Sequence, residues 1–187
     1  MGGIDYAPDE REEVAMSGSP LLGMTVGQIR EKARADAARV LRETWGSPPA
    51  VPVQPVNIAR ALGLGVFSAE LGDDAWGMLI GSSAGVDIYL DRDQPTNRFR
   101  FSCAHEIGHF VHRDADIEAD QAFVDKRSDA GHGRADEIFA NEFAASLLMP
   151  EAHFVSAVRA GEDNYDLAQR FDVSLQAVQL RRHHLNL

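Results

Sequence analysis

Apolar residues that recur every three or four positions predict most of the secondary structure of this chain. They place helices at 25–46, 56–62, 96–111 and 134–148, with two or three shorter helices between 151 and 185. Thr25 is suited to cap the first of these helices, and Pro150 ends the fourth.

Three short apolar runs between the second and third predicted helices have the length and the flanking turn residues of β-strands. They are Gly65–Ala69, Trp76–Ile80 and Val86–Leu90. The polar stretch 114–133 shows little periodicity, so we assign it no element. The predicted fold is therefore α+β, mostly helical, with a small sheet of about three strands.

Length and charge narrow the classes of protein to which this chain can belong. Its 187 residues suggest one domain, which we place at 25–187, after an acidic N-terminal tail at 1–24 that we expect to be flexible. The formal net charge of -11 argues against a general affinity for nucleic acid or anionic membranes. A single cysteine, no apolar run long enough for a membrane span and no secretory signal predict a cytoplasmic protein.

The strongest chemical signal is the run His105-Glu106-Ile107-Gly108-His109 in the third predicted helix. Two histidines four residues apart lie on one helical face, about 40° apart in projection, so both imidazoles can reach one ion. Glu106 can then act as general base toward a water whose pKa zinc lowers to about 7. The pattern predicts a Zn2+ hydrolase, with Mn2+ or another divalent ion as the alternative in the cell.

A catalytic zinc usually takes a third protein ligand, which must come from another part of the chain. His112 shares the face of His105 but lies about 10 Å further along the helix axis, too far for both to bind one ion. We therefore predict Glu137 as the third ligand, with Asn141 one turn later placed to orient a ligand imidazole. The competing candidates are Asp136, Glu142 and His132.

Three stretches of the sequence resemble the ImmA/IrrE (DUF955) family of metallo-endopeptidases. Residues 98–109 (RFRFSCAHEIGH) are similar to the lead into that family's histidine motif, and residues 137–150 (EIFANEFAASLLMP) to its second signature. Residues 56–64 resemble the short helix that enters its first strand, and the likeness covers roughly 26–187.

This resemblance implies specific roles for the motif residues. His105, His109 and Glu137 would be zinc ligands and Glu106 the catalytic base, in a gluzincin-like (zincin-like) protease core with the active site between the two motif helices. It also implies a substrate, a helix-turn-helix transcriptional repressor whose cleavage derepresses its operon. A protease toxin or stress-response protease with another target is an alternative, as is a regulator that binds a repressor or DNA without cutting it.

The sequence leaves the remaining parts of a protease site open. Tyr89, His112 and His132 are candidate donors to the oxyanion formed during peptide hydrolysis. The strand at 86–90 directly precedes the motif helix, so we expect it to be the sheet edge that binds substrate as an added strand.

Two further features are predicted to be structural. Cys103 points about 160° away from the ligand face, as expected of a small core residue. Residues 167–178 look like a helix-turn-helix, but acidic and basic residues cancel in this part of the chain. We therefore expect the segment to pack within the protein and not to bind DNA directly.

Overall fold

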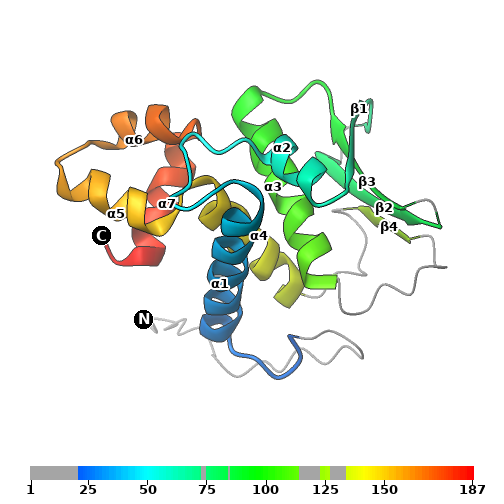
Figure 1. The fold of residues 1–187 in the computed structure, drawn as a ribbon, viewed down its shortest axis with the longest axis horizontal. Coiled ribbons are helices and arrows are strands. Elements are labelled where there is room, and N and C mark those ends of the chain that lie inside the picture. Colours follow the sequence, from blue (N-terminus) through cyan, green and yellow to red (C-terminus); the bar gives the residue numbers. More distant parts are fainter. Residues whose placement is uncertain (1–20, 73–74, 84, 114–122, 127–133) are drawn as a thin grey trace, which may run out of the picture.

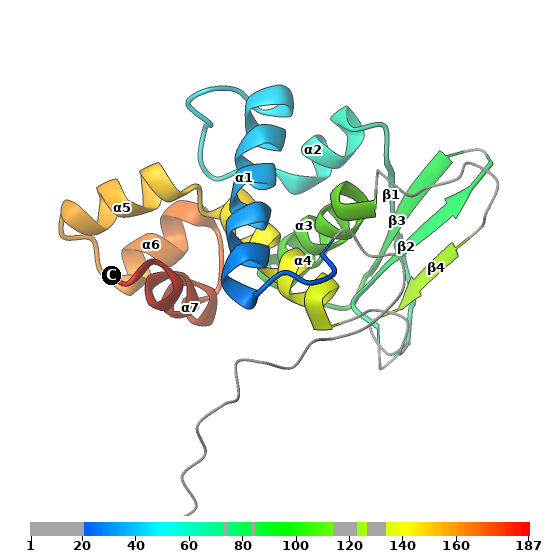
Figure 2. The ribbon, with the colours of Figure 1, turned by 90° about the horizontal axis from the view of Figure 1, so that it is seen from below.

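The computed structural model describes residues 21–72, 75–83, 85–113, 123–126 and 134–187. Within them the helices are α1 Val26–Thr44, α2 Pro55–Ala61, α3 Thr96–Arg113, α4 Arg134–Leu148, α5 Glu151–Arg159, α6 Asn164–Phe171 and α7 Leu175–Leu185. The strands are β1 Gly65–Ala69, β2 Gly77–Ser82, β3 Gly85–Asp91 and β4 Phe123–Lys126. The sheet lies at one end of the molecule beside α3, and α5–α7 lie at the other (Figures 1 and 2). The predicted α+β class, mostly helical with a small sheet, is confirmed.

The described helices begin close to where the sequence places them. Thr25 caps α1 through its hydroxyl, and Gln28 completes the capping box. Of the predicted tail, residues 1–20 lie outside the described residues, whereas Leu21 is buried in the core. The packed chain therefore begins before the predicted boundary at residue 25. Among the described helices, none combines the length and apolar character that a membrane span requires.

The sheet has the strand order β1-β3-β2-β4, with β1 and β3 parallel and the other pairs antiparallel. The three predicted strands are present, and β4 adds a fourth within the polar stretch that gave no periodic signal. The prediction that residues 86–90 form an edge is wrong. The chain passes from β1 to β2 and then turns back, so β3 inserts between them and is hydrogen-bonded on both sides.

One face of the sheet belongs to the hydrophobic core. Leu79, Ile88 and Leu90 are fully buried on this face, together with core residues of α3. The opposite face carries Phe67 and Tyr89, whose rings stack with centroids 5.3 Å apart. Because strand side chains alternate between faces, the residues of β2 that can reach α3 are the odd-numbered ones.

Helix α4 packs against both α1 and α3. Its approach to α3 is close because Gly108 has no side chain: a Cβ there would lie 3.0 Å from Cα of Ala140 and 3.2 Å from the ring of Phe143. The absence of a side chain at position 108 therefore sets how closely α4 can approach α3.

Two buried arginines connect the C-terminal helices to this core. Arg100 of α3 donates a hydrogen bond to the carbonyl of Val53. It also donates to the carbonyls of Phe171 and Asp172, and these bonds join α3 to the turn between α6 and α7. Arg181 of α7 is 1% exposed. Burial lowers the pKa of both guanidinium groups, so each depends on its partners to stay buried as a cation.

The partner of Arg181 is Glu142, a buried carboxylate on α4. It accepts hydrogen bonds from Arg181 at 3.0 Å and from Arg34 of α1 at 2.7 Å, and its other oxygen lies 2.9 Å from Nδ1 of His184. Burial lowers the pKa of His184, with the neighbouring cation Arg30 as the next cause. One acidic side chain thus holds α1, α4 and α7 together.

These contacts support a structural role for the helix-turn-helix-like segment. Leu167, Phe171 and Val178 are fully buried in the core. Arg181, a basic residue of α7, is enclosed within the protein and is not available to contact DNA.

We predict that Glu142→Ala lowers the free energy of unfolding by about 3 kcal/mol or more, because it leaves Arg181 buried without its carboxylate. Urea denaturation measures the change. The control Glu43→Ala removes an exposed carboxylate paired with Arg39 and should cost less than about 1 kcal/mol. Equal losses for the two variants would contradict a central role for Glu142.

Candidate metal centre

The motif residues lie on the buried part of α3. His105, Glu106 and His109 are 4%, 6% and 2% exposed. The helix continues for four residues beyond His109 to Arg113. Both imidazoles are therefore attached to one continuous helix, and its backbone fixes their spacing.

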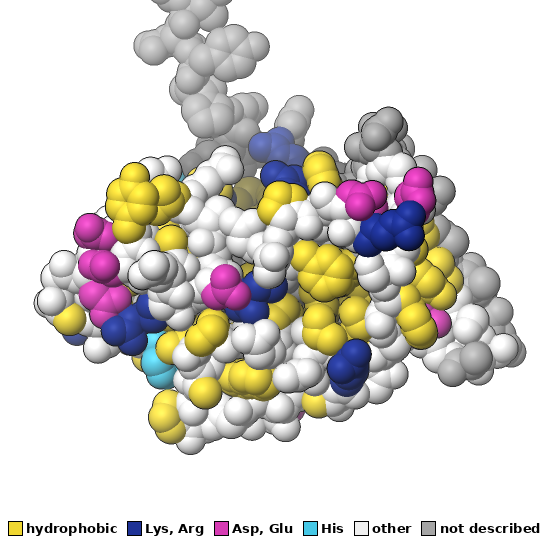
Figure 3. Space-filling view, turned by 90° about the horizontal axis from the view of Figure 1, so that it is seen from above, with side chains coloured by type: hydrophobic (Ala, Val, Ile, Leu, Met, Phe, Trp, Pro, Cys, Tyr) yellow, Lys and Arg dark blue, Asp and Glu magenta, His cyan; other side chains and the backbone are white. Residues whose placement is uncertain are grey.

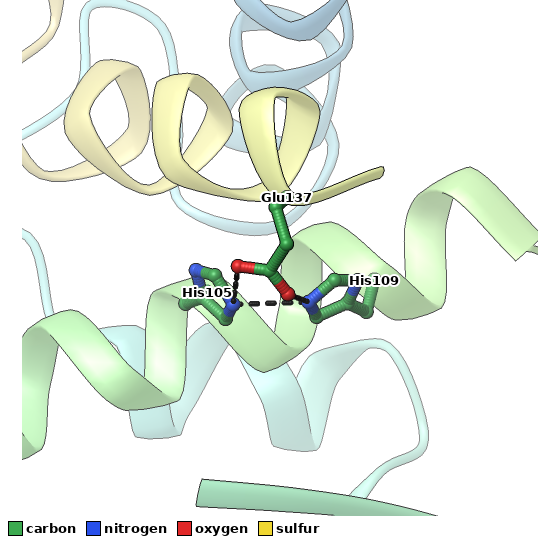
Figure 4. A group of neighbouring side chains, drawn as sticks. All are labelled: His105, His109 and Glu137. Atoms are coloured by element: carbon green, nitrogen blue, oxygen red, sulfur yellow. Dashed lines mark hydrogen bonds and ion pairs between the residues drawn. The ribbon is translucent and has the colours of Figure 1, made fainter. Parts of the chain in front are cut away.

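The two imidazoles and one carboxylate of α4 converge on a common point (Figure 4). Nε2 of His105 lies 2.9 Å from Nε2 of His109. The Glu137 carboxylate approaches them with one oxygen 3.4 Å from His109 Nε2 and the other 3.7 Å from His105 Nε2. All three ligand atoms lie within 4.8 Å of one another.

These distances fit one divalent metal ion. Tetrahedral ligands at the usual bond lengths of about 2.0–2.1 Å are separated by roughly 3.3 Å, and the observed distances fall on either side of that value. Two imidazole nitrogens and one carboxylate oxygen form the donor set of one class of zinc hydrolases. We infer that this cluster is a metal site.

The structure separates Glu137 from the competing third ligands. Glu142 is enclosed by Arg34, Arg181 and His184 on another side of α4. Asp136 lies 2.9 Å from Nε2 of His112. His132 lies outside the described residues. Of the candidates that the structure describes, only Glu137 is grouped with the two histidines.

The general-base candidate occupies the side of α3 that faces the sheet. A Cβ built on Gly77 of β2 would lie 2.6 Å from Oε1 of Glu106. The carboxylate therefore rests directly against the backbone of β2, in space that any other residue at position 77 would fill. Sequence reasoning missed Gly77, because a glycine in a short strand gives no sign of which helix will meet it.

The remaining predicted site residues have different placements. The strand register puts Tyr89 beside Phe67 on the outer face of the sheet, away from α3, so its prediction as an oxyanion donor is corrected. His112 has one ring nitrogen bound to Asp136, and its oxyanion role stays a prediction. Asn141 is exposed on α4 one turn after Glu137, and its role in orienting an imidazole also stays a prediction.

Cys103 has the environment expected of a core residue. It is fully buried, and burial raises the pKa of its thiol to about 12, with the charge of Glu106 as the next cause. The thiol therefore stays protonated at neutral pH, which disfavours metal binding or nucleophilic chemistry.

Comparison with known families matches residues 59–183, from α2 to α7, to the IrrE N-terminal-like domain of the Peptidase_M78 family. The chain belongs to this family. Its members are metallopeptidases, in agreement with the cluster of His105, His109 and Glu137.

The fold is also similar to that of a Mycobacterium tuberculosis transcriptional regulator, with a TM-score of 0.56 and 17% sequence identity. The alignment covers 82% of this chain and 50% of the regulator, so this chain spans about half of that protein's length. At this identity the likeness shows the fold alone. Comparison with curated proteins finds no match.

We predict that Glu137→Ala lowers the affinity for Zn2+ by more than roughly a hundredfold, the upper end of losses seen for residues that only support ligands. Isothermal titration of the metal-free protein with Zn2+ measures this. The control Asp136→Asn changes the preceding carboxylate and should bind Zn2+ nearly as tightly as the wild type. Full zinc affinity in Glu137→Ala would remove Glu137 from the ligand set.

Proposed function

We propose that this protein is a zinc-dependent endopeptidase in which His105, His109 and Glu137 hold the metal and Glu106 is the general base. The observation that carries the proposal is the convergence of two imidazole nitrogens and a carboxylate beside a buried glutamate. Membership of a metallopeptidase family supports it.

The chain supplies the groups that peptide hydrolysis requires. A bound divalent ion would polarise the scissile carbonyl and make water a better nucleophile. Glu106, adjacent to His105 and shielded from solvent, is placed to accept a proton from the attacking water and to pass it to the leaving amine. Contact with Gly77 limits the positions that its carboxylate can take.

We propose that the substrate is a cytoplasmic helix-turn-helix transcriptional repressor, whose cleavage derepresses its operon. The support is the resemblance to the ImmA/IrrE family; the structural neighbour is itself described as a transcriptional regulator. Strand β4 is our choice for the edge that receives substrate. It pairs with β2, the strand whose Gly77 contacts Glu106.

A regulator that binds DNA without cutting a protein is less well supported. Arg181 is buried against Glu142, and Arg170 is paired with Glu162. Among the described side chains on the face drawn in Figure 3, basic groups are scattered, several of them beside acidic ones, and form no continuous basic patch. The electrostatic surface that DNA binding needs is therefore missing from this face.

A substrate trap tests the proposed function directly. Glu106→Gln retains the size of the side chain but cannot act as a base, so it should bind zinc and substrate while losing nearly all turnover. Proteins captured by this variant and by the wild type in a bacterial cytoplasm are identified by mass spectrometry. We expect a helix-turn-helix repressor held intact by the variant and cut by the wild type.

The other outcomes of this trap are equally informative. A captured and cleaved protein of another class would retain the peptidase and replace its substrate, as for a toxin or stress-response protease. If wild type and variant hold the same uncut protein, the zinc site is not the working part and the non-cleaving regulator becomes the leading alternative. If Glu106→Gln retains turnover, Glu106 is not the base.

The glycine beside Glu106 gives a second test. We predict that Gly77→Ala lowers kcat by roughly ten- to a hundredfold, because a displacement of about 1 Å in a catalytic group has effects of this size. The added methyl displaces the mobile end of Glu106 and leaves the strand in place, so KM, zinc content and unfolding midpoint should change little.

Two comparisons identify the cause of that loss. In a Glu106→Asp background, whose shorter side chain lies further from residue 77, Gly77→Ala should cost much less activity. The control Gly27→Ala adds a methyl at an exposed position of α1, where its nearest neighbour is 3.9 Å away, and should leave kcat unchanged. Additive losses in the double variant would contradict a contact between Gly77 and Glu106.

A further inference from the structure

Arg98 lies on the same face of α3 as the metal-binding histidines. It precedes His105 by seven residues, which places the two side chains about 20° apart in projection and about 10 Å apart along the axis. Unlike His105 and His109, Arg98 is exposed. The proposed active-site face of α3 therefore extends to an accessible cation two turns from the metal centre.

The Arg98 guanidinium is held against an aromatic ring. Its central carbon lies 4.5 Å from the centroid of the Trp76 ring, within the range of a cation–π contact. Trp76 directly precedes Gly77, the residue that touches Glu106. The stack of Arg98 on Trp76 thus lies at the side of the proposed active-site face of α3 that is next to the sheet.

A chain of hydrogen bonds fixes Trp76 to α3. The side-chain amide of Gln94 donates to the Trp76 carbonyl at 2.9 Å, and the amide oxygen of Gln94 accepts from the Ser102 hydroxyl at 3.0 Å. Ser102 lies one turn before Glu106 on α3. Both members of the stack are therefore positioned by the helix that carries the site.

The charge of Arg98 has no acidic partner within the ranges that the structure describes. Among the other exposed arginines in these ranges, Arg92 and Arg170 are paired with glutamates, whereas Arg42, Arg60 and Arg159 share the unpaired state of Arg98 but do not lie on the face of α3 that carries the histidines. The chain carries 29 acidic residues against 18 basic ones, so acidic partners are not scarce. Stacking uses the face of a guanidinium and leaves its edge N–H groups available for a carboxylate.

We propose that Arg98 and Trp76 form a substrate subsite that binds an acidic side chain of the peptide. This proposal rests on the proposed peptidase function. The separation of about 10 Å corresponds to roughly three residues of an extended peptide, so the acidic residue lies about three positions from the bond that is cut. Arg98 binds the carboxylate through its edge, and Trp76 holds the guanidinium in place.

Cleavage of a peptide library tests the specificity. Zinc-loaded wild type, Arg98→Ala and Arg98→Glu are each incubated with peptides from a chymotryptic digest of a bacterial lysate, which keeps acidic and basic residues at internal positions, and cleavage sites are read by mass spectrometry. Wild type should enrich Asp and Glu at one position, Arg98→Ala should reduce that enrichment about tenfold, and Arg98→Glu should replace it with Lys and Arg. The control Arg60→Glu makes the same charge change on α2 and should keep the wild-type preference.

A binding measurement tests the subsite without turnover. The chain has two tryptophans, so Trp45→Phe leaves Trp76 as the only one, and Glu106→Gln prevents cleavage. Blocked hexapeptides of Ala and Gly carrying one Glu, or one Gln as the matched control, are titrated while Trp76 fluorescence is followed. A saturable change with Glu peptides alone, abolished by Arg98→Ala, is the expected result.

The two experiments distinguish failure of the subsite from failure of the peptidase. Cleavage without an acidic preference, or with one that Arg98→Glu leaves unaltered, overturns the subsite and retains the activity. Glu-specific binding without any cleavage retains the subsite and overturns the activity. If neither cleavage nor Glu-specific binding is found, both proposals fall.

Discussion

The arrangement of the candidate site depends on the close packing of α3 against α4. Gly108 allows Ala140 to approach the α3 backbone. Gly108 directly precedes His109 and Ala140 lies about one turn after Glu137, so this contact is next to the metal cluster. If α4 moved outward by the width of a side chain, Glu137 would no longer reach His105 and His109. A ligand set drawn from two helices is therefore only as well defined as the distance between them.

Buried charges keep α4 in place from its other side. Glu137 and Glu142 are five residues apart, which directs them about 140° apart around the helix axis. The first joins the histidines of α3, and the second joins Arg34 of α1 and Arg181 of α7. Removing either member of a buried ion pair such as Glu142 and Arg181 lowers stability more than removing a member of an exposed pair, because the remaining charge stays out of water.

Local sequence patterns predicted the parts of the structure that local interactions determine. The periodicity of α1 and α4 and the cap at Thr25 act over one or two helical turns, and the pair His105 and His109 follows from helix geometry alone. The choice of Glu137 over its neighbours rested on the polar residue Asn141 one turn later, and the family resemblance implied the same residue.

The features that were missed or misplaced arise from tertiary contacts. Whether β3 is an edge depends on whether both β1 and β2 pair with it, and the alternation of residues along a strand does not show which strands lie beside it. The orientation of Tyr89 follows from that same register. Gly77 and Trp76 meet α3 through the tertiary packing of the sheet, so their places beside Glu106 and Arg98 could not be foreseen.

The contact between the first and last helices has a consequence for biosynthesis. Arg34 donates to the carbonyl of His184, 150 residues later, and both side chains bind the same carboxylate of Glu142. While the ribosome still holds α7, the nascent chain cannot complete the ionic partners of Glu142. The helix that carries Glu137 thus reaches its fully supported position only after α7 has left the ribosome and packed against it.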